Sequence, residues 1–355
     1  MSQQKELDYH KQLDIDYTLR LRAVLDTMAP FVKDFFRAIE PRTSAKTRIS
    51  YAYDIRVFFN FLIETHPTFN DYLLNSFKLS DLENIEAYEL EEYLEYLKVY
   101  RDTNDRRQVN TEKGLARKLS SLRSFYHYFY KRERISKNPA LLLDTPKFHE
   151  KAIIRLDVDE IALLLDYVEH GGNQLSGQRK VYFEKTKNRD LAILTLLLGT
   201  GIRVSECVGL DIQDVDFKNN GIHITRKGGS EMVVYFGDEV ENALKSYILV
   251  DRAAVTPVIG HNNALFLSTQ RKRMGIQAVE NMVKKYAAEV IPHKKITPHK
   301  LRSTYGTELY KETGDIYLVA DVLGHKDVNT TKKHYAAIDE NRRRRAAQAV
   351  QLREK

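Results

Sequence analysis

The chain has 355 residues, of which 43% are hydrophobic and 30% are charged, and its formal net charge at pH 7 is +7. This length and hydrophobic content exclude a small disulfide scaffold and a globally disordered chain, and they allow two domains. The single cysteine, Cys207, cannot form an internal disulfide, which fits a reducing compartment. The longest apolar run, Leu191 to Leu198, is too short to span a bilayer, so we expect a cytoplasmic protein with no membrane partner.

Helical periodicity dominates the chain from about residue 17 to residue 130. Apolar side chains recur on one face of each segment, as in Tyr51, Ile55, Phe58, Phe59 and Leu62. Strand signals are nearly absent, and residues 102–110 form a polar, charged connection before another amphipathic helix. We therefore predict an all-helical N-terminal domain of four or five helices.

An interdomain linker is predicted where this periodicity stops. Two prolines and a charged stretch follow Ser136, which is typical of a connection between domains. The predicted division is a helical extension at 1–40, a helical core domain at 41–147, a linker at 148–156, a second domain at 157–337 and a tail at 338–355.

The second half combines helices with three short β-like runs. Turn signals at Asn219-Asn-Gly221 and Gly228-Gly229 separate these runs, which lie at 214–217, 221–226 and 232–236. Helices are predicted at 157–170, 187–199, 238–252, 277–290, 298–313 and 316–323. The predicted fold class is mainly α, with one small three-stranded antiparallel β-sheet in the second domain.

Several common enzyme signatures are missing from the sequence. The segment Gly199-Thr-Gly201 begins like a dinucleotide fingerprint, but Val204 stands where the third glycine would fall. The sequence has no Walker-type phosphate loop and no HExxH pair, and one cysteine cannot build a thiolate zinc cage. We expect neither a metal nor a cofactor.

Six residues in the second half have the chemistry that transfer of a phosphodiester to a tyrosine needs. Each also has an ordinary explanation. Arg203 can form an ion pair with Glu206, and Lys227 can be a solvated turn residue. His299 and Arg302 can cap a helix or add surface polarity, and His325 and Tyr335 can be a helix end and a half-buried tyrosine. In chain order they are Arg203, Lys227, His299, Arg302, His325 and Tyr335.

Taken together, these residues account for each step of a metal-free cleavage. Two guanidinium groups can hold the non-bridging oxygens and offset the charge of a pentacoordinate transition state. A tyrosine with an ordinary pKa of about 10 needs a nearby base and a positive field, which His299 and the arginines can supply. A lysine on a hairpin can protonate the leaving sugar oxygen.

The ordered set resembles the tyrosine recombinases, the phage-integrase family, over most of the chain. Segment 120–126, followed by Asn138-Pro-Ala140, resembles the end of the family's SAM-like DNA core-binding domain, and the C-terminal half resembles its catalytic domain. The resemblance implies that Arg203 and Arg302 clamp the phosphate and that Lys227 is the general acid. It further implies that His299 is the acid/base partner, His325 the second histidine, Tyr335 the nucleophile and Glu206 a support for the first arginine.

The spacing before the nucleophile departs from many family members. Ten residues rather than nine lead from His325 to Tyr335, which leaves the presentation of Tyr335 open. Tyr305, Tyr310 and Tyr317 are nearby alternatives, but none follows the Gly-His element at a suitable distance.

Cationic side chains outside this set are candidates for contacts with DNA. A solvated charged face is the alternative interpretation, and a phosphate interface would weaken steeply with salt. These candidates are Lys113, Arg117, Lys118 and Arg123. For the tail with Arg342 to Arg345, a basic segment touching DNA and a helix donated to a neighbouring protomer both remain open.

The family resemblance implies a double-stranded DNA partner, a homotetramer on two DNA sites and a Holliday junction intermediate. Total length, the extension before residue 41 and the Thr225 to Gly229 hairpin resemble chromosome-dimer resolvases, which implies a dif-like site and a DNA translocase of the FtsK type as a partner. Two alternatives stay open: an integrase or excisionase of a phage or conjugative element, and a non-catalytic architectural DNA-binding protein.

Overall fold

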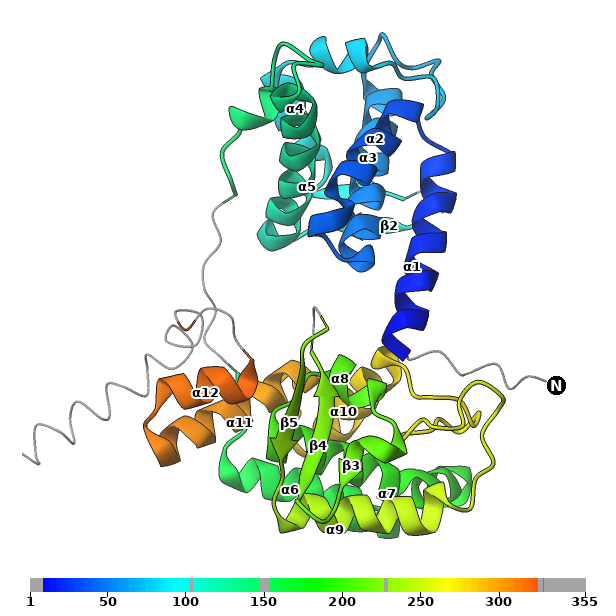
Figure 1. The fold of residues 1–355 in the computed structure, drawn as a ribbon, viewed down its shortest axis with the longest axis vertical. Coiled ribbons are helices and arrows are strands. Elements are labelled where there is room, and N and C mark those ends of the chain that lie inside the picture. Colours follow the sequence, from blue (N-terminus) through cyan, green and yellow to red (C-terminus); the bar gives the residue numbers. More distant parts are fainter. Residues whose placement is uncertain (1–8, 103–104, 147–153, 227–228, 325–327, 329–355) are drawn as a thin grey trace, which may run out of the picture. The chain divides into compact units, whose positions relative to one another are not determined.

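The computed structural model describes residues 9–102, 105–146, 154–226, 229–324 and 328. The chain divides into two compact units, Met1–Lys151 and Ala152–Lys355, each of which is considered by itself (Figure 1). Within the described ranges, no helix has the length and apolar character that crossing a membrane requires.

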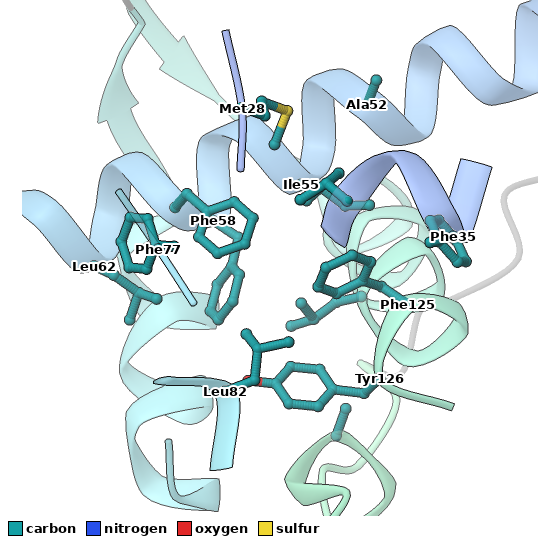
Figure 2. Close-up of a cluster of buried hydrophobic side chains, with 14 of the residues drawn as sticks. Met28, Phe35, Ala52, Ile55, Phe58, Leu62, Phe77, Leu82, Phe125 and Tyr126 are labelled. Atoms are coloured by element: carbon teal, nitrogen blue, oxygen red, sulfur yellow. The ribbon is translucent and has the colours of Figure 1, made fainter. Parts of the chain in front are cut away.

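The first unit is a bundle of helices around an aromatic core. Its helices are α1 Tyr9–Asp26, α2 Pro30–Ile39, α3 Ala45–Thr65, α4 Ala87–Tyr96 and α5 Glu112–Lys131, with 3₁₀ turns η1 Glu40–Arg42, η2 Leu79–Glu83 and η3 Pro139–Leu141. Phe35, Phe58, Phe125 and Tyr126 interlock between α2, α3 and α5 (Figure 2). Edge-to-face pairs such as Phe35 with Phe125, whose ring centroids are 5.3 Å apart, are a favourable geometry for aromatic side chains.

A short β-ribbon interrupts the helices of this unit. Strand β1 Val99–Arg101 pairs antiparallel with β2 Arg107–Val109. The sequence predicted only a polar connection here and an all-helical domain, so the ribbon is a correction. The periodic signal is weak because each strand has three residues and buries only its middle side chain in part, Tyr100 and Gln108 respectively.

The second unit surrounds one long central helix with shorter helices and a sheet. Its helices are α6 Val158–His170, α7 Gly177–Thr200, α8 Val204–Gly209, α9 Asp238–Ser246, α10 Ile276–Val290, α11 Pro298–Thr313 and α12 Ile316–Leu323, with 3₁₀ turns η4 Gly171–Gln174 and η5 Ile212–Asp214 and a π-helical turn η6 Tyr247–Arg252. Helix α7 packs against α6, α9 and α11. The second half of α7 is apolar on every side, as expected of a central helix.

The sheet of the second unit is antiparallel in the order β3-β4-β5. The strands are β3 Val215–Asp216, β4 Gly221–Thr225 and β5 Glu231–Tyr235, and Ile222 of β4 pairs with Val234 of β5. The predicted fold class, mainly α with one small three-stranded antiparallel sheet, is confirmed.

Local boundaries were predicted best where capping residues mark them. Helices α11 and α12 begin and end where predicted, since Pro298 and Asp315 start them and glycines end them. Helix α7 instead begins at Gly177, well before the predicted Lys187. Its first turns are exposed and charged and show no apolar face.

Candidate active site

The turn after α7 brings the first candidate arginine into place. Gly201 ends α7 in the left-handed region with φ +63°, and a Cβ at this position would lie 2.3 Å from the ring of Tyr305. A glycine is therefore required both by the backbone conformation and by the close approach of α11. The turn leads directly to Arg203, the N-cap residue of α8.

Glu206 holds Arg203 from two sides. One carboxylate oxygen accepts from the backbone N–H of Arg203 at 2.7 Å, and the other accepts from its guanidinium Nη1 at 2.8 Å. Glu206 is only 4% exposed, so both bonds lie in a poorly hydrated setting where a charge-assisted contact is strong. The two side chains are therefore in direct contact, and a supporting role of Glu206 in the reaction stays a prediction.

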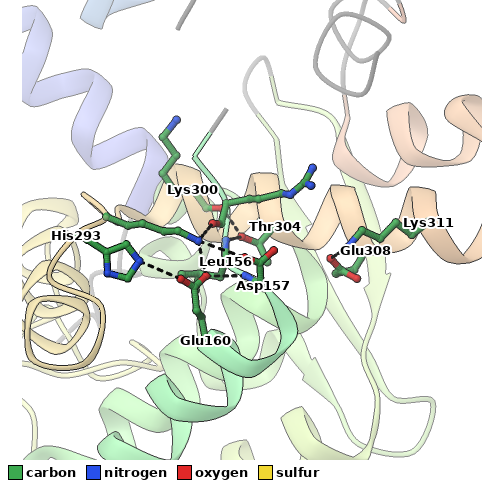
Figure 3. Close-up of polar contacts among 10 residues, drawn as sticks. Leu156, Asp157, Glu160, His293, Lys300, Thr304, Glu308 and Lys311 are labelled. Carbon is green, nitrogen blue, oxygen red and sulfur yellow. Dashed lines mark hydrogen bonds and ion pairs between the residues drawn. The ribbon is translucent and has the colours of Figure 1, made fainter. Parts of the chain in front are cut away.

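Helix α11, which carries His299 and Arg302, is anchored to the segment that precedes α6. The backbone N–H of Leu156 donates to Thr304 Oγ1 at 2.9 Å (Figure 3). Lys294, just before α11, donates to Glu160 at 2.6 Å and to the carbonyl of Arg155 at 3.1 Å. These contacts fix the first turns of α11 within the second unit.

Arg203 and Arg302 converge on the C-terminal end of α12. Arg203 Nη2 donates to the carbonyl of Gly324 at 3.1 Å, and Arg302 donates to the carbonyls of Leu323 and Gly201. Arg302 is buried, whereas the side chain of Arg203 is 34% exposed. Two guanidinium groups, one from the N-cap of α8 and one from α11, therefore bond the carbonyls of consecutive residues. That they clamp a phosphate stays a prediction.

A third arginine, which the sequence did not single out, reaches the same helix end. Arg226 follows β4 and donates to the carbonyls of Asp321 at 3.2 Å and Val322 at 2.6 Å. Burial lowers the pKa of Arg226, the Glu206 carboxylate opposes this shift and the Arg203 charge adds to it. The only sequence signal was its place beside Lys227 at the hairpin tip.

The remaining catalytic candidates are placed only in part. His299 lies exposed in the first turn of α11, one turn before Arg302. Lys227, His325 and Tyr335 lie outside the described residues, as does the tail at 338–355.

The alternative tyrosines are poorly suited to act as the nucleophile. Tyr305 and Tyr310 belong to the small apolar cluster between α11 and α12, and burial raises the pKa of Tyr305, which disfavours the phenolate. Tyr317 is exposed in the first turn of α12, whereas the arginines bind the opposite end of that helix.

All four candidates for DNA contact interact with other residues of the protein. Arg117 makes two bonds to the buried carboxylate of Asp54, at 2.6 and 2.7 Å, and Lys118, itself buried, donates to the same carboxylate at 3.2 Å. Arg123 donates to the carbonyls of Ala140 and Leu143 beyond α5. Lys113 is exposed at the start of α5. Contact with DNA stays a prediction for all four.

Among the described residues, no group of three or more histidine, cysteine, aspartate or glutamate side chains is arranged to hold a metal ion.

Comparison with known proteins shows the family. Residues 155–342 match the phage integrase family, and residues 32–133 match the phage integrase N-terminal SAM-like domain. Tyrosine recombinase XerC of Caldanaerobacter subterraneus subsp. tengcongensis is 33% identical over 321 residues, which cover 88% of this chain and 83% of the relative. The chain therefore belongs to the phage integrase family and is a tyrosine site-specific recombinase.

Other relatives and solved structures agree with this assignment. Tyrosine recombinase XerD of Staphylococcus aureus is 28% identical over 307 residues, covering 86% of this chain and 93% of the relative. The structure of XerH site-specific recombinase bound to palindromic difH substrate is 20% identical and has a TM-score of 0.61, covering 86% of this chain and 82% of that chain. A lambda integrase dimer bound to a COC′ core site is 16% identical with a TM-score of 0.57, covering 88% of this chain and 94% of that chain. At these identities the solved structures show the fold.

Proposed function

We propose that this recombinase binds double-stranded DNA and cleaves it with Tyr335. The tyrosine oxygen attacks the scissile phosphorus, the bond from phosphorus to the 5′-oxygen breaks, and a 3′-phosphotyrosyl link and a free 5′-hydroxyl result. Because the ester conserves the energy of the broken bond, a second strand can attack it without ATP.

The observation that carries this proposal is the convergence of Arg203 and Arg302 on Leu323 and Gly324. A phosphate with its non-bridging oxygens on both guanidinium groups would lie beside the residues that lead to His325. The guanidinium of Arg203 has five N–H donors, more than its contacts to Glu206 and Gly324 use. Both arginines would neutralise the charge that develops in the transition state, the role that a metal ion fills in other nucleases.

Proton transfer completes the mechanism. His299 accepts the tyrosine proton and Lys227 donates a proton to the leaving 5′-oxygen, while His325 supports the phosphate as the second histidine. We assign the catalytic domain to 157–337 and the core DNA-binding domain to 41–147.

The proposed assembly is a homotetramer that holds two DNA sites and exchanges strands through a Holliday junction. We propose resolution of chromosome dimers at a dif-like site, with activation by a DNA translocase of the FtsK type. Similarity to XerC and XerD over most of the chain supports this choice, and the XerH structure contains a difH substrate.

Covalent trapping tests the mechanism. A binding site is first selected with the full-length protein from a random duplex library, then rebuilt as a nicked suicide substrate and analysed on denaturing gels. The wild type should form a covalent adduct, Tyr335→Phe should lose it while keeping DNA affinity, and Tyr305→Phe should retain it. An adduct that persists in Tyr335→Phe would refute the assignment of the nucleophile, and wild-type protein that binds without forming any adduct would support an architectural role.

The choice of sites tests the cellular role. A plasmid with two identical copies of the selected site should be resolved by this protein, as dimer resolution requires. A reaction that proceeds only between two different sites would instead identify an integrase of a mobile element.

A further inference from the structure

Arg226 links the β-hairpin of the second unit to α12. Its backbone N–H closes the hairpin by donating to the carbonyl of Ser230 at 2.8 Å. Its guanidinium reaches across to Asp321 and Val322, 95 and 96 positions further along the chain. One residue therefore belongs to the hairpin through its backbone and to the end of α12 through its side chain.

The helix end that Arg226 binds is the one that Arg203 and Arg302 also bind. The last carbonyls of a helix lack partners within the helix, and the helix dipole favours positive charge there. Arg226 covers the carbonyls of Asp321 and Val322, Arg302 that of Leu323 and Arg203 that of Gly324. Arg226 thus bonds two carbonyls that neither of the other two arginines bonds.

Close packing keeps the guanidinium of Arg226 in place. Gly324 ends α12 with φ +62°, and a Cβ on it would lie 2.0 Å from Nη1 of Arg226. The Nε atom of Arg226 is buried and has no hydrogen-bond partner among the described residues. The side chain is thus held by two carbonyl bonds and by contact with the glycine.

We infer that Arg226 is a positioning residue for the cleavage reaction: it docks the hairpin on the end of α12 and thereby sets where the next residue, Lys227, acts. The inference rests on the proposed function, in which Lys227 protonates the leaving oxygen. A general acid must lie within hydrogen-bond reach of that oxygen, and displacement by about 1 Å can cost about 100-fold in rate. The planar fork of an arginine suits two neighbouring carbonyls, and a lysine cannot replace that geometry.

The test compares two leaving groups on the same suicide duplex. One substrate has the ordinary 5′-oxygen at the scissile phosphate, and the other has a bridging 5′-sulfur, which leaves as a thiolate and needs no proton. Loss of the acid or of its position should therefore slow cleavage of the oxygen substrate alone. A general loss of structure should slow both substrates equally.

We expect Arg226→Ala to cleave the oxygen substrate about 10- to 100-fold more slowly than the wild type, with a change of less than about threefold on the sulfur substrate. Arg226→Lys should cleave the oxygen substrate at a rate between those of the wild type and Arg226→Ala. Lys227→Ala should be slowed on the oxygen substrate and not on the sulfur substrate, as Arg226→Ala is. The matched control is Arg179→Ala, which removes an exposed arginine of α7 and should leave both rates unchanged.

Three results would overturn the inference: equal slowing of both substrates, slowing of neither, or selective slowing in Lys227→Ala but not in Arg226→Ala. Circular dichroism and thermal unfolding of each variant identify a folding defect, and Arg226→Gln provides a second substitution that keeps the side chain long. Failure of the proposed function looks different, because wild-type protein would then give no Tyr335-dependent adduct on either substrate.

Discussion

Arg203 and Arg302 donate to the carbonyls of adjacent residues, Gly324 and Leu323, although one is the N-cap of α8 and the other lies in α11. A second link joins the two elements, because Arg302 also bonds the carbonyl of Gly201, 101 positions before it. The position of each guanidinium therefore depends on the turn after α7 and on the end of α12. Substitutions in those supporting elements should change both stability and cleavage.

Glu206→Gln should weaken the support of Arg203. The buried carboxylate accepts from both the backbone and the side chain of Arg203, and a neutral amide loses the charge and places an N–H₂ group near one donor. We expect a loss of about 1–3 kcal/mol in the free energy of unfolding, measured with urea, and slower adduct formation. Glu241→Gln, which breaks a more exposed pair with Lys245, should cost less than about 1 kcal/mol. Equal costs at the two sites would show that burial of Glu206 does not matter.

Gly324→Ala should lower stability for two separable reasons. The left-handed backbone costs a non-glycine residue about 1–2 kcal/mol, and the new Cβ meets the Arg226 guanidinium. Gly260→Ala provides the control, since Gly260 has φ +87° but open space around it. In an Arg226→Ala background, the two glycine substitutions should lower stability by the same amount, as measured by thermal unfolding. A persistent difference would mean that the contact with Arg226 is not the cause.

Asp54→Asn should destabilise the first unit more than a substitution that breaks an exposed ion pair. Its carboxylate is 3% exposed and binds both Arg117 and Lys118, so its loss leaves two cations without their anion. Breaking one partner of a buried pair costs about 3–5 kcal/mol, which urea unfolding would resolve. Asp34→Asn, whose pair with Arg134 is partly exposed, should change stability by less than about 1 kcal/mol. A small effect at Asp54 would show that the charge of this carboxylate contributes little to stability.

Acid should weaken the anchor of α11 through Glu160. Burial alone would raise the pKa of Glu160, but the bonds from Lys294 and from the backbone N–H of Asp157 outweigh it and lower the pKa. A carboxyl with a lowered folded-state pKa contributes stability above its unfolded pKa of about 4.3 and loses it as the pH falls through the folded value. Urea unfolding between pH 7 and pH 3 should therefore show a shallower acid decline in Glu160→Gln than in the wild type.

Glu184→Gln is the control for this pH dependence, because its pair with Lys187 is exposed. It should retain the acid decline of the wild type. If the stability of Glu160→Gln declines with acid as steeply as that of the wild type, the acid-sensitive contact lies elsewhere.

Local signals in the sequence determined much of the fold and of the candidate site. Helices α11 and α12 and the three-stranded sheet follow from caps, turns and apolar periodicity, which act over a few residues. The contact between Arg203 and Glu206 could also be expected, because residues three apart in a helical segment are neighbours.

Only the tertiary structure decided which distant partners these side chains have. Arg117 and Lys118 meet Asp54 63 and 64 positions away, and Arg226 meets α12 95 positions away. A cation in an amphipathic helix or at a hairpin tip has the same local pattern whether it faces solvent, DNA or a buried carboxylate. Burial and the approach of another backbone distinguish these cases, and both arise only when distant segments pack together.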